Sequence, residues 1–272
     1  MADLFVCAIF KNEAPYIYEW LSFHAFIGVK HFFLYDNGSD DNSRDIISSW
    51  PNQSMITVID WPGSGMQIHA YNNMLEKHRD RDEWCAFIDC DEFLTPQGGV
   101  RLPEILDFFE PRCNALFVHW LMFGSSGQIE PTSGLVTERF VRRSLNSFPP
   151  NNVGKTIVKL NKAKTIRTCH VVQCEGAMMS DDGEEIDQEF YGIHSKSSHN
   201  NIALNHYFTK SLSEWHQRRA IGKADKRPSD ADYKRSEEEF HRHDHNQVED
   251  LKAYEIAQRA KEIYYLNNTY DI

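Results

Sequence analysis

Residues 3–28 read DLFVCAIFKNEAPYIYEWLSFHAFIG, an apolar run that passes into a helical pattern and ends at a glycine. The run over 3–10 is rich in strand-forming side chains. Apolar side chains then recur at helical spacing from Ile17 to His24, and Gly28 is a typical stop signal. The stretch therefore predicts a strand followed by a helix.

The same alternation recurs along the next sixty residues. HFFLY (31–35) precedes a helical pattern at 40–50, MITVID (55–60) precedes another at 66–80, and WCAFID (84–89) closes the series. Each apolar run is too continuous for a sheet with one wet face, so both faces should be covered. We expect an α/β fold with a mostly parallel sheet between helices.

The rhythm changes near residue 113. Apolar runs at 115–123, 135–143 and 154–161 resemble strands with no long helix between them, and charged helical patterns follow at 210–224, 230–243 and 246–266. We expect three parts: an α/β half over 1–112, a mixed-sheet half over 113–209 and a helical extension over 210–272.

Composition excludes some classes of protein. The 272 residues include 40 acidic and 29 basic side chains, a net charge of −11 that argues against a nucleic-acid binder. No apolar run approaches the roughly 20 residues of a transmembrane helix, and the first residues lack the pattern of a signal peptide. The six cysteines form no CxxC pair, which fits a reducing compartment.

Acidic residues cluster where the predicted strands end. In FIDCDEFL (87–94), Asp89 and Asp91 are one residue apart, and hard oxygen ligands of this kind suit Mg²⁺ or Mn²⁺. The alternative is that Asp91 and Glu92 cap a following turn. A calcium loop is excluded, because the segment lacks the central glycine and closing glutamate of an EF-hand.

Two segments carry a resemblance to a known family. AIFKNEAPYIYEWLSFHAFIGVKHFFLYDNGSDD (8–41) and WCAFIDCDEFL (84–94) resemble the GT-A glycosyltransferases of the family 2 and family 92 type. The resemblance implies a Rossmann-like GT-A fold that binds a nucleotide-sugar donor. Asp36 would then face the base or ribose, and Asp89 and Asp91 would form the DxD motif that holds Mn²⁺ or Mg²⁺ on the diphosphate.

The resemblance also implies ligands from the second half of the chain. His206, in NHYFTKS (205–211), resembles the histidine that completes the metal shell, and Lys210 lies close enough in sequence to reach a phosphate. The histidine cluster HRHDH (241–245) is a rival, although its charged helical setting favours a solvated face.

Three further side chains are candidates for nucleotide contact. Asn12 and Glu13 follow the first strand, where they serve equally well as helix cap and first-turn acid. Gln67 begins a predicted helix and is a candidate for a donor contact, although a glutamine on such a helix is usually solvated.

Family 92 members are inverting enzymes, so the resemblance implies that a carboxylate takes the proton of the acceptor hydroxyl. We rank Glu138 first and Asp182, beside Asp181, second. Each has an alternative role, because Glu138 can pair with a nearby arginine and 180–189 can be an exposed acidic loop. Trp120 and Phe123 are candidates for a sugar platform or for core packing.

The sequence thus predicts a metal-dependent hexosyltransferase. The expected donor is a UDP-sugar, galactose or glucose by kinship, and the expected acceptor is a glycan or surface polysaccharide. A metal-dependent nucleotidyltransferase and a non-catalytic sugar-binding protein of the same fold are the alternatives. With no anchor or stem like that of animal members, we expect a cytoplasmic protein, compatible with peripheral membrane contact.

Overall fold

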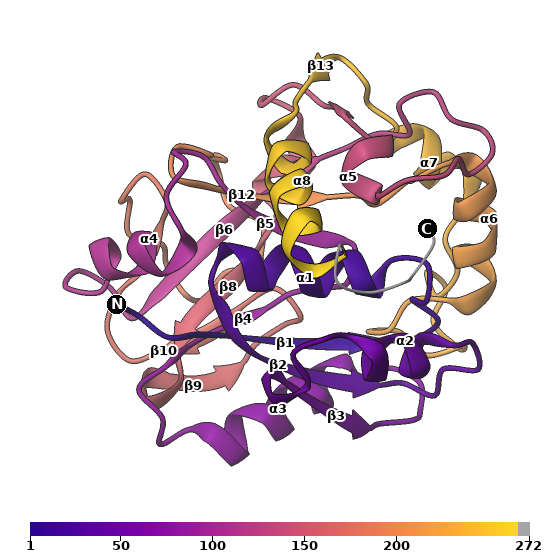
Figure 1. The fold of residues 1–272 in the computed structure, drawn as a ribbon. Coiled ribbons are helices and arrows are strands. Elements are labelled where there is room, and N and C mark those ends of the chain that lie inside the picture. Colours follow the sequence, from indigo (N-terminus) through magenta and orange to yellow (C-terminus); the bar gives the residue numbers. More distant parts are fainter. Residues whose placement is uncertain (266–272) are drawn as a thin grey trace.

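The computed structural model describes residues 1–265, which are organised around one nine-stranded mixed sheet (Figure 1). Eight strands lie in the order β3 (Ile56–Asp60), β2 (Val29–Asp36), β1 (Leu4–Phe10), β4 (Trp84–Phe87), β8 (Gly154–Lys159), β6 (Ala115–Met122), β12 (Ile202–His206) and β5 (Glu92–Pro96). The ninth strand, β11 (Met178–Ser180), pairs with the start of β6. The sheet therefore joins strands from both predicted halves of the chain.

The direction of the strands changes along the sheet. The strands from β3 to β4 are parallel, as the strand–helix alternation predicted. Next along, β8 runs antiparallel to both β4 and β6, β12 is parallel to β6, and β5 is antiparallel to β12. The α/β class and the mixed second half are thus confirmed.

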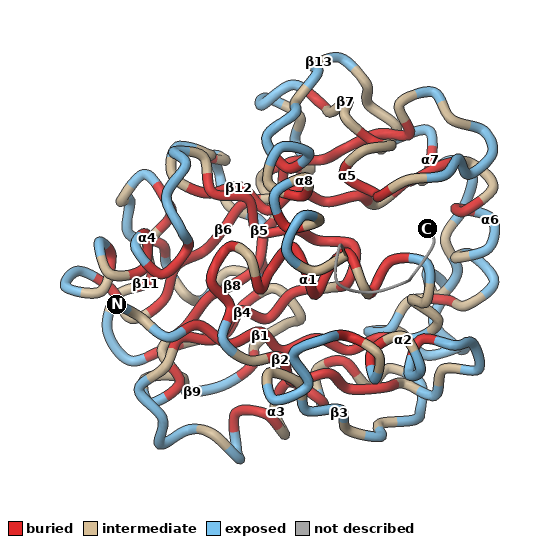
Figure 2. Tube along the Cα trace, viewed as in Figure 1, coloured by how far each residue is buried: buried red, intermediate tan, exposed pale blue. Residues whose placement is uncertain are grey.

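Helices cover both faces of the sheet, which explains the uninterrupted apolar runs. Even-numbered side chains of β1 pack in one core with α1 (Ile17–Ile27), whereas its odd-numbered side chains pack in a second core with α3 (Gln67–His78). Figure 2 shows the resulting buried layer along the central strands. With both faces dry, neither set of side chains in β1 can be polar.

The remaining elements lie around this central sheet (Figure 1). The other helices are α2 (Ser43–Ser49), α4 (Leu102–Phe109), α5 (Val136–Arg139), α6 (Leu212–Ile221), α7 (Glu237–His243) and α8 (Lys252–Tyr264). Two small antiparallel pairs join β9 (Ala163–Ile166) to β10 (Val172–Cys174) and β7 (Arg142–Arg143) to β13 (Val248–Glu249). Single 3₁₀ turns are η1 (Gln53–Met55), η2 (Pro149–Asn152) and η3 (Leu160–Lys162).

Gly28 ends α1 as predicted, and a side chain there is excluded for two reasons. Its φ of 117° lies in the left-handed region, and a Cβ atom would lie 2.6 Å from Cδ of Pro103. Gly28 therefore allows the chain to turn from α1 into β2 while α4 packs closely against the turn.

Three sequence predictions of secondary structure were wrong in part. The run 135–143 was predicted as a strand, but it forms α5 and contributes only Arg142–Arg143 to a strand. The buried carboxylate of Glu19 accepts hydrogen bonds from the backbone N–H groups of Val136 (2.6 Å) and Thr137 (3.1 Å), which stabilises a helical turn.

The predicted helix over 230–243 begins only at Glu237, where Ser236 accepts a hydrogen bond from the N–H of Glu239. The pattern over 246–266 likewise forms a helix only from Lys252 to Tyr264, and its last residue lies outside the described residues.

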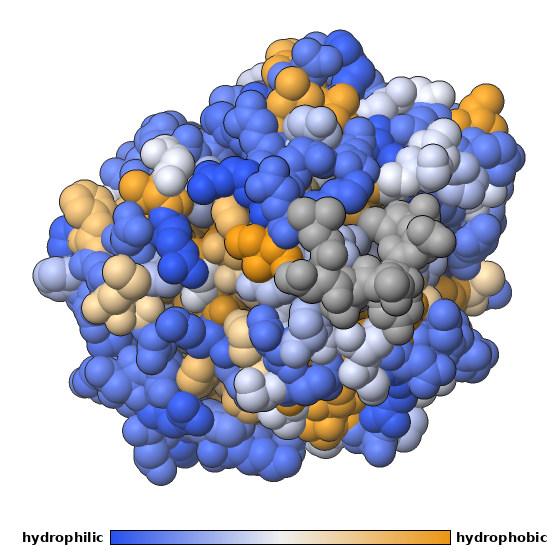
Figure 3. Space-filling view, viewed as in Figure 1, coloured by the Kyte–Doolittle hydropathy of each residue, from blue (hydrophilic) through white to orange (hydrophobic). Residues whose placement is uncertain are grey.

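The division at 112/113 and 209/210 stays a prediction, although the sheet continues across the first boundary through the pairing of β4 with β8. No helix within residues 1–265 combines the length and apolarity needed to cross a membrane. The face shown in Figure 3 is mostly hydrophilic, with apolar side chains in scattered groups.

A buried ion pair fixes α6 against the rest of the molecule. Glu214 receives two hydrogen bonds from the Arg139 guanidinium, at 2.9 and 2.5 Å, and one from the Tyr16 hydroxyl at 2.8 Å. It also receives hydrogen bonds from the backbone and hydroxyl of Ser211, which begins α6. Burial alone would raise the pKa of Glu214, but these donors lower it to about 2.

We predict that Glu214→Gln lowers the free energy of unfolding by about 3 kcal/mol at neutral pH, because the buried Arg139 loses its counter-charge. A carboxylate with a depressed pKa in the folded state stabilises above its unfolded value of 4.5 and loses that effect as the pH falls toward 2. The difference in free energy of unfolding between wild type and variant, measured in urea, should therefore narrow from pH 5 to pH 2.

Glu238→Gln, which removes only an exposed pair with Arg242, is the control and should change stability by less than about 1 kcal/mol. A pH-independent difference would contradict the assignment.

Candidate active site

A cavity of about 310 Å³ opens at the carboxyl ends of β1 and β4. Its walls come from the loop after β1, the β4–β5 link, β6, the loop before β10, and the chain from β12 to α7. Its charged lining residues are the cations Lys11, Arg218, Lys223 and Arg235 and the acids Glu13, Asp89, Asp91, Asp225 and Glu239. This is the edge of an α/β sheet where loops converge and ligands commonly bind.

Asp89 is held by residues from two other elements. Its Oδ1 accepts a hydrogen bond from Gln67 at the start of α3 (2.5 Å), and its Oδ2 lies 2.9 Å from the Lys155 ammonium on β8. Lys155 is 1% exposed, and although burial lowers its pKa, Asp89 and Glu92 raise it well above the usual value. Lys155 is therefore a permanent buried cation beneath the β4–β5 link.

Glu92 fixes the β4–β5 link through hydrogen bonds to two neighbours. Its carboxylate accepts hydrogen bonds from the backbone N–H of Asp89 (2.9 Å) and from the indole N–H of Trp120 (2.7 Å), and it lies 3.8 Å from the Lys155 ammonium. Burial raises the pKa of Glu92 well above its usual value. The third acid of FIDCDEFL is thus a structural anchor that fixes the backbone of Asp89.

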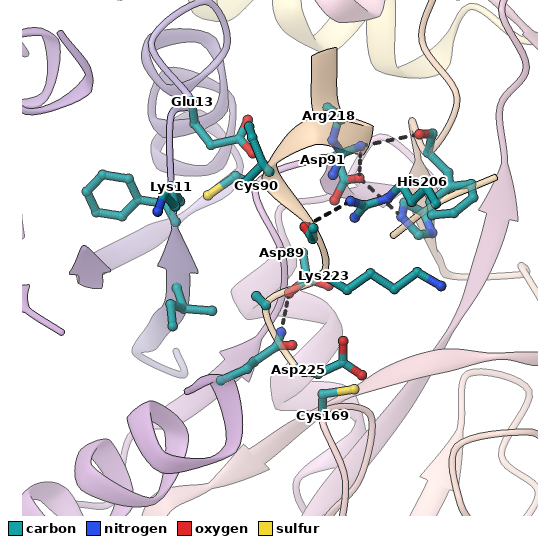
Figure 4. A pocket seen from close by; sticks show the side chains of 18 of the residues that line it. Lys11, Glu13, Asp89, Cys90, Asp91, Cys169, His206, Arg218, Lys223 and Asp225 are labelled. Atoms are coloured by element: carbon teal, nitrogen blue, oxygen red, sulfur yellow. Dashed lines mark hydrogen bonds and ion pairs between the residues drawn. The ribbon is translucent and has the colours of Figure 1, made fainter. Parts of the chain in front are cut away.

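Asp91 meets two side chains from the C-terminal half of the chain. Its Oδ2 lies 2.7 Å from Nη1 of Arg218 on α6 and 3.4 Å from Nε2 of His206 at the end of β12 (Figure 4). Burial would raise the pKa of Asp91, but the charge of Arg218 and the contact with His206 hold it well below the usual range. Asp91 is therefore a buried carboxylate that stays ionised.

Asp91 and His206 are the side chains of the cavity that could contribute ligands to a metal. Within residues 1–265, no group of three or more His, Cys, Asp or Glu side chains is arranged to hold a metal ion. Asp91 and His206 nevertheless lie in contact, and within the same residues Nδ1 of His206 is buried without a hydrogen-bond partner. Mg²⁺ typically binds one or two carboxylates together with substrate phosphates and water, so this pair fits a cation that arrives with a diphosphate.

Two buried polar atoms near the cavity have no hydrogen-bond partner within residues 1–265. One is the Lys210 ammonium, which lies behind the cavity lining at 4.3 Å from the centre of the Tyr16 ring. Burial, reinforced by Arg218, lowers the pKa of Lys210 to about 8. The Oε2 atom of Glu13 also lacks a partner, and burial raises the pKa of this carboxyl.

A family model described as glycosyltransferase family 92 matches residues 2–253 of this sequence. The chain belongs to glycosyltransferase family 92. It is 32% identical over 136 residues to a family 92 protein of Oryza sativa subsp. japonica, a match that covers 48% of this chain and 23% of that protein. A family 92 protein of Ricinus communis is 32% identical over 92 residues, which are 34% of this chain and 16% of that protein.

This family 92 chain therefore matches less than a quarter of the length of either plant relative. Among solved structures, S. aureus TarS 1–349 in complex with UDP is 17% identical, with a TM-score of 0.38 over 58% of this chain and 47% of TarS. The family match together with the α/β mixed sheet confirms the GT-A type of fold that the resemblance implied.

The structure brings together many of the residues that the sequence singled out. Glu13, Gln67, Asp89, Asp91 and His206 all line the cavity. The roles proposed for them, and for Lys210 behind the wall, stay predictions.

Two predicted nucleotide contacts lie outside the cavity lining. Asn12 forms two hydrogen bonds with Asp40, at 2.6 and 2.9 Å, and so ties the loop after β1 to the loop after β2. Asp36 accepts a hydrogen bond from the N–H of Ser39 and pairs with Arg44 at 3.0 Å. The neighbouring Asn37 lines the cavity instead.

Both candidates for the general base also lie outside the cavity lining. Glu138 accepts hydrogen bonds from the N–H of Leu135 and the side chain of Gln258, so it links α5 to α8. Asp182 bonds to Ser180 and pairs with Lys196 at 3.6 Å. Its neighbour Asp181 is buried and accepts backbone N–H groups at the start of β12. This placement favours an acid of the cavity as the proton acceptor.

Of the predicted aromatic platform and of the rival histidine cluster, only one residue each lines the cavity. Trp120 lines the cavity and lies 4.4 Å from His206 between ring centres, whereas Phe123 is 1% exposed and packs in the core. In the HRHDH cluster only His243 lines the cavity.

Sequence reasoning missed most of the cations and two acids of the site, Asp225 and Glu239. The cations Lys155, Arg218, Lys223 and Arg235 belong to segments with no motif, and Lys155 and Arg218 lie far in sequence from the acids that they contact. The one available signal was Lys155, a lysine inside the predicted strand at 154–161.

We predict that Lys155→Met lowers the free energy of unfolding by about 3 kcal/mol, because Asp89 and the buried Glu92 lose their shared counter-charge. Lys159→Met on the same strand is a matched control. Lys159 pairs with the more exposed Asp82 and Glu110, so its loss should cost less than about 1 kcal/mol. Equal losses of unfolding free energy for the two variants in urea would show that the buried ion pairs of Lys155 stabilise the fold no more than the exposed pairs of Lys159.

Proposed function

We propose that this chain is a metal-dependent, inverting glycosyltransferase that transfers a hexose from a UDP-sugar to a glycan. The observation that supports this most is the contact of the ionised Asp91 with His206 at a cavity lined by four Lys and Arg side chains. Family membership supports the reaction class.

The cations support a position for the diphosphate of the donor. Arg218, Lys223 and Arg235 reach the cavity from α6 and the chain that follows it, and Lys210 is a buried cation behind them. Cations in a site of low solvent access stabilise the negative charge that develops on a departing nucleoside diphosphate. The nucleoside then lies toward Lys11, Glu13 and Asn37, in the loops after β1 and β2.

Asp91 and His206 would hold the divalent cation. When bound, Mn²⁺ or Mg²⁺ supplies Lewis-acid stabilisation of the leaving diphosphate. The chain itself contributes the alignment of Asp91: Arg218 and His206 keep it ionised and buried, and the Glu92 anchor fixes the backbone beside it. Arg218 contacts Asp91 from the cavity wall, so it lies where it would bind a phosphate beside the cation.

Asp89, held by Gln67 and Lys155, lines the cavity together with Trp120, and Glu92 accepts hydrogen bonds from the backbone of Asp89 and the indole of Trp120. A carboxylate with fixed orientation accepts hydrogen bonds from sugar hydroxyls, and an aromatic face packs against the apolar face of a pyranose. We therefore assign the hexose of the donor to the part of the cavity lined by Asp89 and Trp120, the sugar end.

We predict that UDP with Mn²⁺ raises the melting temperature of the wild type, because a ligand bound only to the folded state stabilises it, by about 2.7 kcal/mol at one hundred times its Kd. The wild type should also release UDP from UDP-galactose or UDP-glucose. Asp91→Asn should lose the Mn²⁺-dependent part of the thermal shift and slow UDP release about 100-fold, the equivalent of about 3 kcal/mol of charge stabilisation.

Asp60→Asn is the matched control, because Asp60 also ends a strand but pairs with Arg44 outside the cavity lining. Unchanged UDP release by Asp91→Asn would overturn the metal assignment. Release of UMP and sugar phosphate would instead indicate nucleotidyl chemistry, and binding without any release would indicate a sugar-binding protein.

A further inference from the structure

The segment 222–236, between α6 and α7, closes one side of the cavity. Arg235 donates a hydrogen bond to the carbonyl of Gly222 (3.1 Å), and the Tyr233 hydroxyl donates to the carbonyl of Ile221 (3.1 Å). Lys223 pairs with Glu239 of α7 at 3.1 Å. The segment is therefore folded back on itself, and it presents Lys223, Asp225 and Arg235 to the cavity.

Gly222 allows this return of the chain. Its φ of 86° lies in the left-handed region, and a Cβ atom would lie 2.3 Å from the Tyr233 ring. The backbone of the segment is thus fixed by close internal contacts, and this backbone sets the position of the charged side chains.

Of the five acids that line the cavity, three are already paired. Asp89 is bound by Gln67 and Lys155, Asp91 by Arg218 and His206, and Glu239 by Lys223. A carboxylate whose oxygens are engaged by cations is a weak proton acceptor, because the cations favour its ionised form. Glu13 and Asp225 remain.

Glu13 lies on the side of the cavity assigned to the nucleoside, next to the diphosphate. Burial raises the pKa of its carboxyl, the charges of Lys210, Arg218 and Arg235 lower it, and Cys90 of the β4–β5 link lines the cavity nearby (Figure 4). Glu13 therefore lies near the cations assigned to the phosphates, a position that suits the placement of those cations better than proton transfer at the sugar.

Asp225 has a different position. Within residues 1–265 its side chain forms no hydrogen bond or ion pair, it is exposed to the cavity, and it lies beside Cys169 (Figure 4). Asp225, Cys169 and Asp89 all line the cavity, so Asp225 opens into the same space as the carboxylate assigned to the sugar. An unpaired acid facing the donor sugar is the arrangement that a general base requires.

We propose that Asp225 accepts the proton of the acceptor hydroxyl during transfer, an inference that rests on the function proposed above. The acceptor oxygen forms a bond to the anomeric carbon while the bond from that carbon to the diphosphate oxygen breaks. The bonding pair leaves with UDP, and the acceptor proton passes to the carboxylate of Asp225.

The test uses two acceptors of different chemistry, water and azide, with UDP-galactose or UDP-glucose as donor. Water must lose a proton when it attacks, whereas azide is an anion with no proton to lose. We expect Asp225→Asn to slow UDP release to water about 100-fold, within the range of general-base assistance. UDP release with azide, which forms a glycosyl azide, should stay within about threefold of the wild type.

Asp232→Asn is the control, because Asp232 lies in the same segment but pairs with Lys226 outside the cavity lining. It should match the wild type with both acceptors. Glu13→Gln, Glu138→Gln and Asp182→Asn should not show the combination of slow hydrolysis and normal azide reaction.

The thermal shift with UDP separates failure of this inference from failure of the proposed function. If UDP stabilises the wild type and Asp225→Asn equally but both hydrolyse donor at the same rate, Asp225 is not the base. Loss of UDP binding in Asp225→Asn, or the azide pattern in another of these variants, also overturns the assignment. A wild type that neither binds UDP nor releases it would overturn the proposed function and this inference with it.

Discussion

The site depends on one buried ammonium group. Lys155 comes from β8, which runs antiparallel to β4, and it reaches the link between β4 and β5 from beneath. Without this cation, Asp89 and Glu92 would be two like charges in a region of low solvent access, and the link could not hold both. With it, Glu92 can fix the backbone N–H of Asp89 and the indole of Trp120 in a single arrangement.

The second acid of the motif depends on a different part of the chain. Asp91 contacts His206 from β12 and Arg218 from α6, and α6 is held in turn by the pair of Glu214 with Arg139. The parallel half of the sheet thus presents the acids, and the C-terminal half presents most of the groups that face them. Neither half contains a complete site.

The sequence predicted features that depend on residues close together in the chain, and it missed features that depend on residues far apart in the chain. The strand–helix alternation and the stop at Gly28 depend on neighbouring residues, so pattern alone located them. The acids of FIDCDEFL were visible because they adjoin an apolar run. Their partners lie 66 and 127 residues away, for Lys155 and Arg218, and no local pattern marks a lone lysine or arginine as the partner of a distant acid.

The same limit explains the general-base candidates. Glu138 was chosen because it follows the strands of the second half, and Asp182 because it lies in an acidic loop, but both carboxylates are bound by side chains or backbone groups outside the cavity lining. No sequence pattern of this kind marks Asp225. The turn at α5 was missed for a related reason, because the group that stabilises it, Glu19, belongs to α1.

The placement of β12 has a consequence for the order of assembly. Among the described strands, β5 pairs only with β12, whose pairing joins residues 92–96 to residues 202–206. During synthesis, β5 must therefore wait for more than a hundred further residues before its backbone groups find their partner, and until then it is an open edge prone to pair with other chains. Because the same late strand carries His206, the last strand pairing of the sheet also brings this histidine to Asp91.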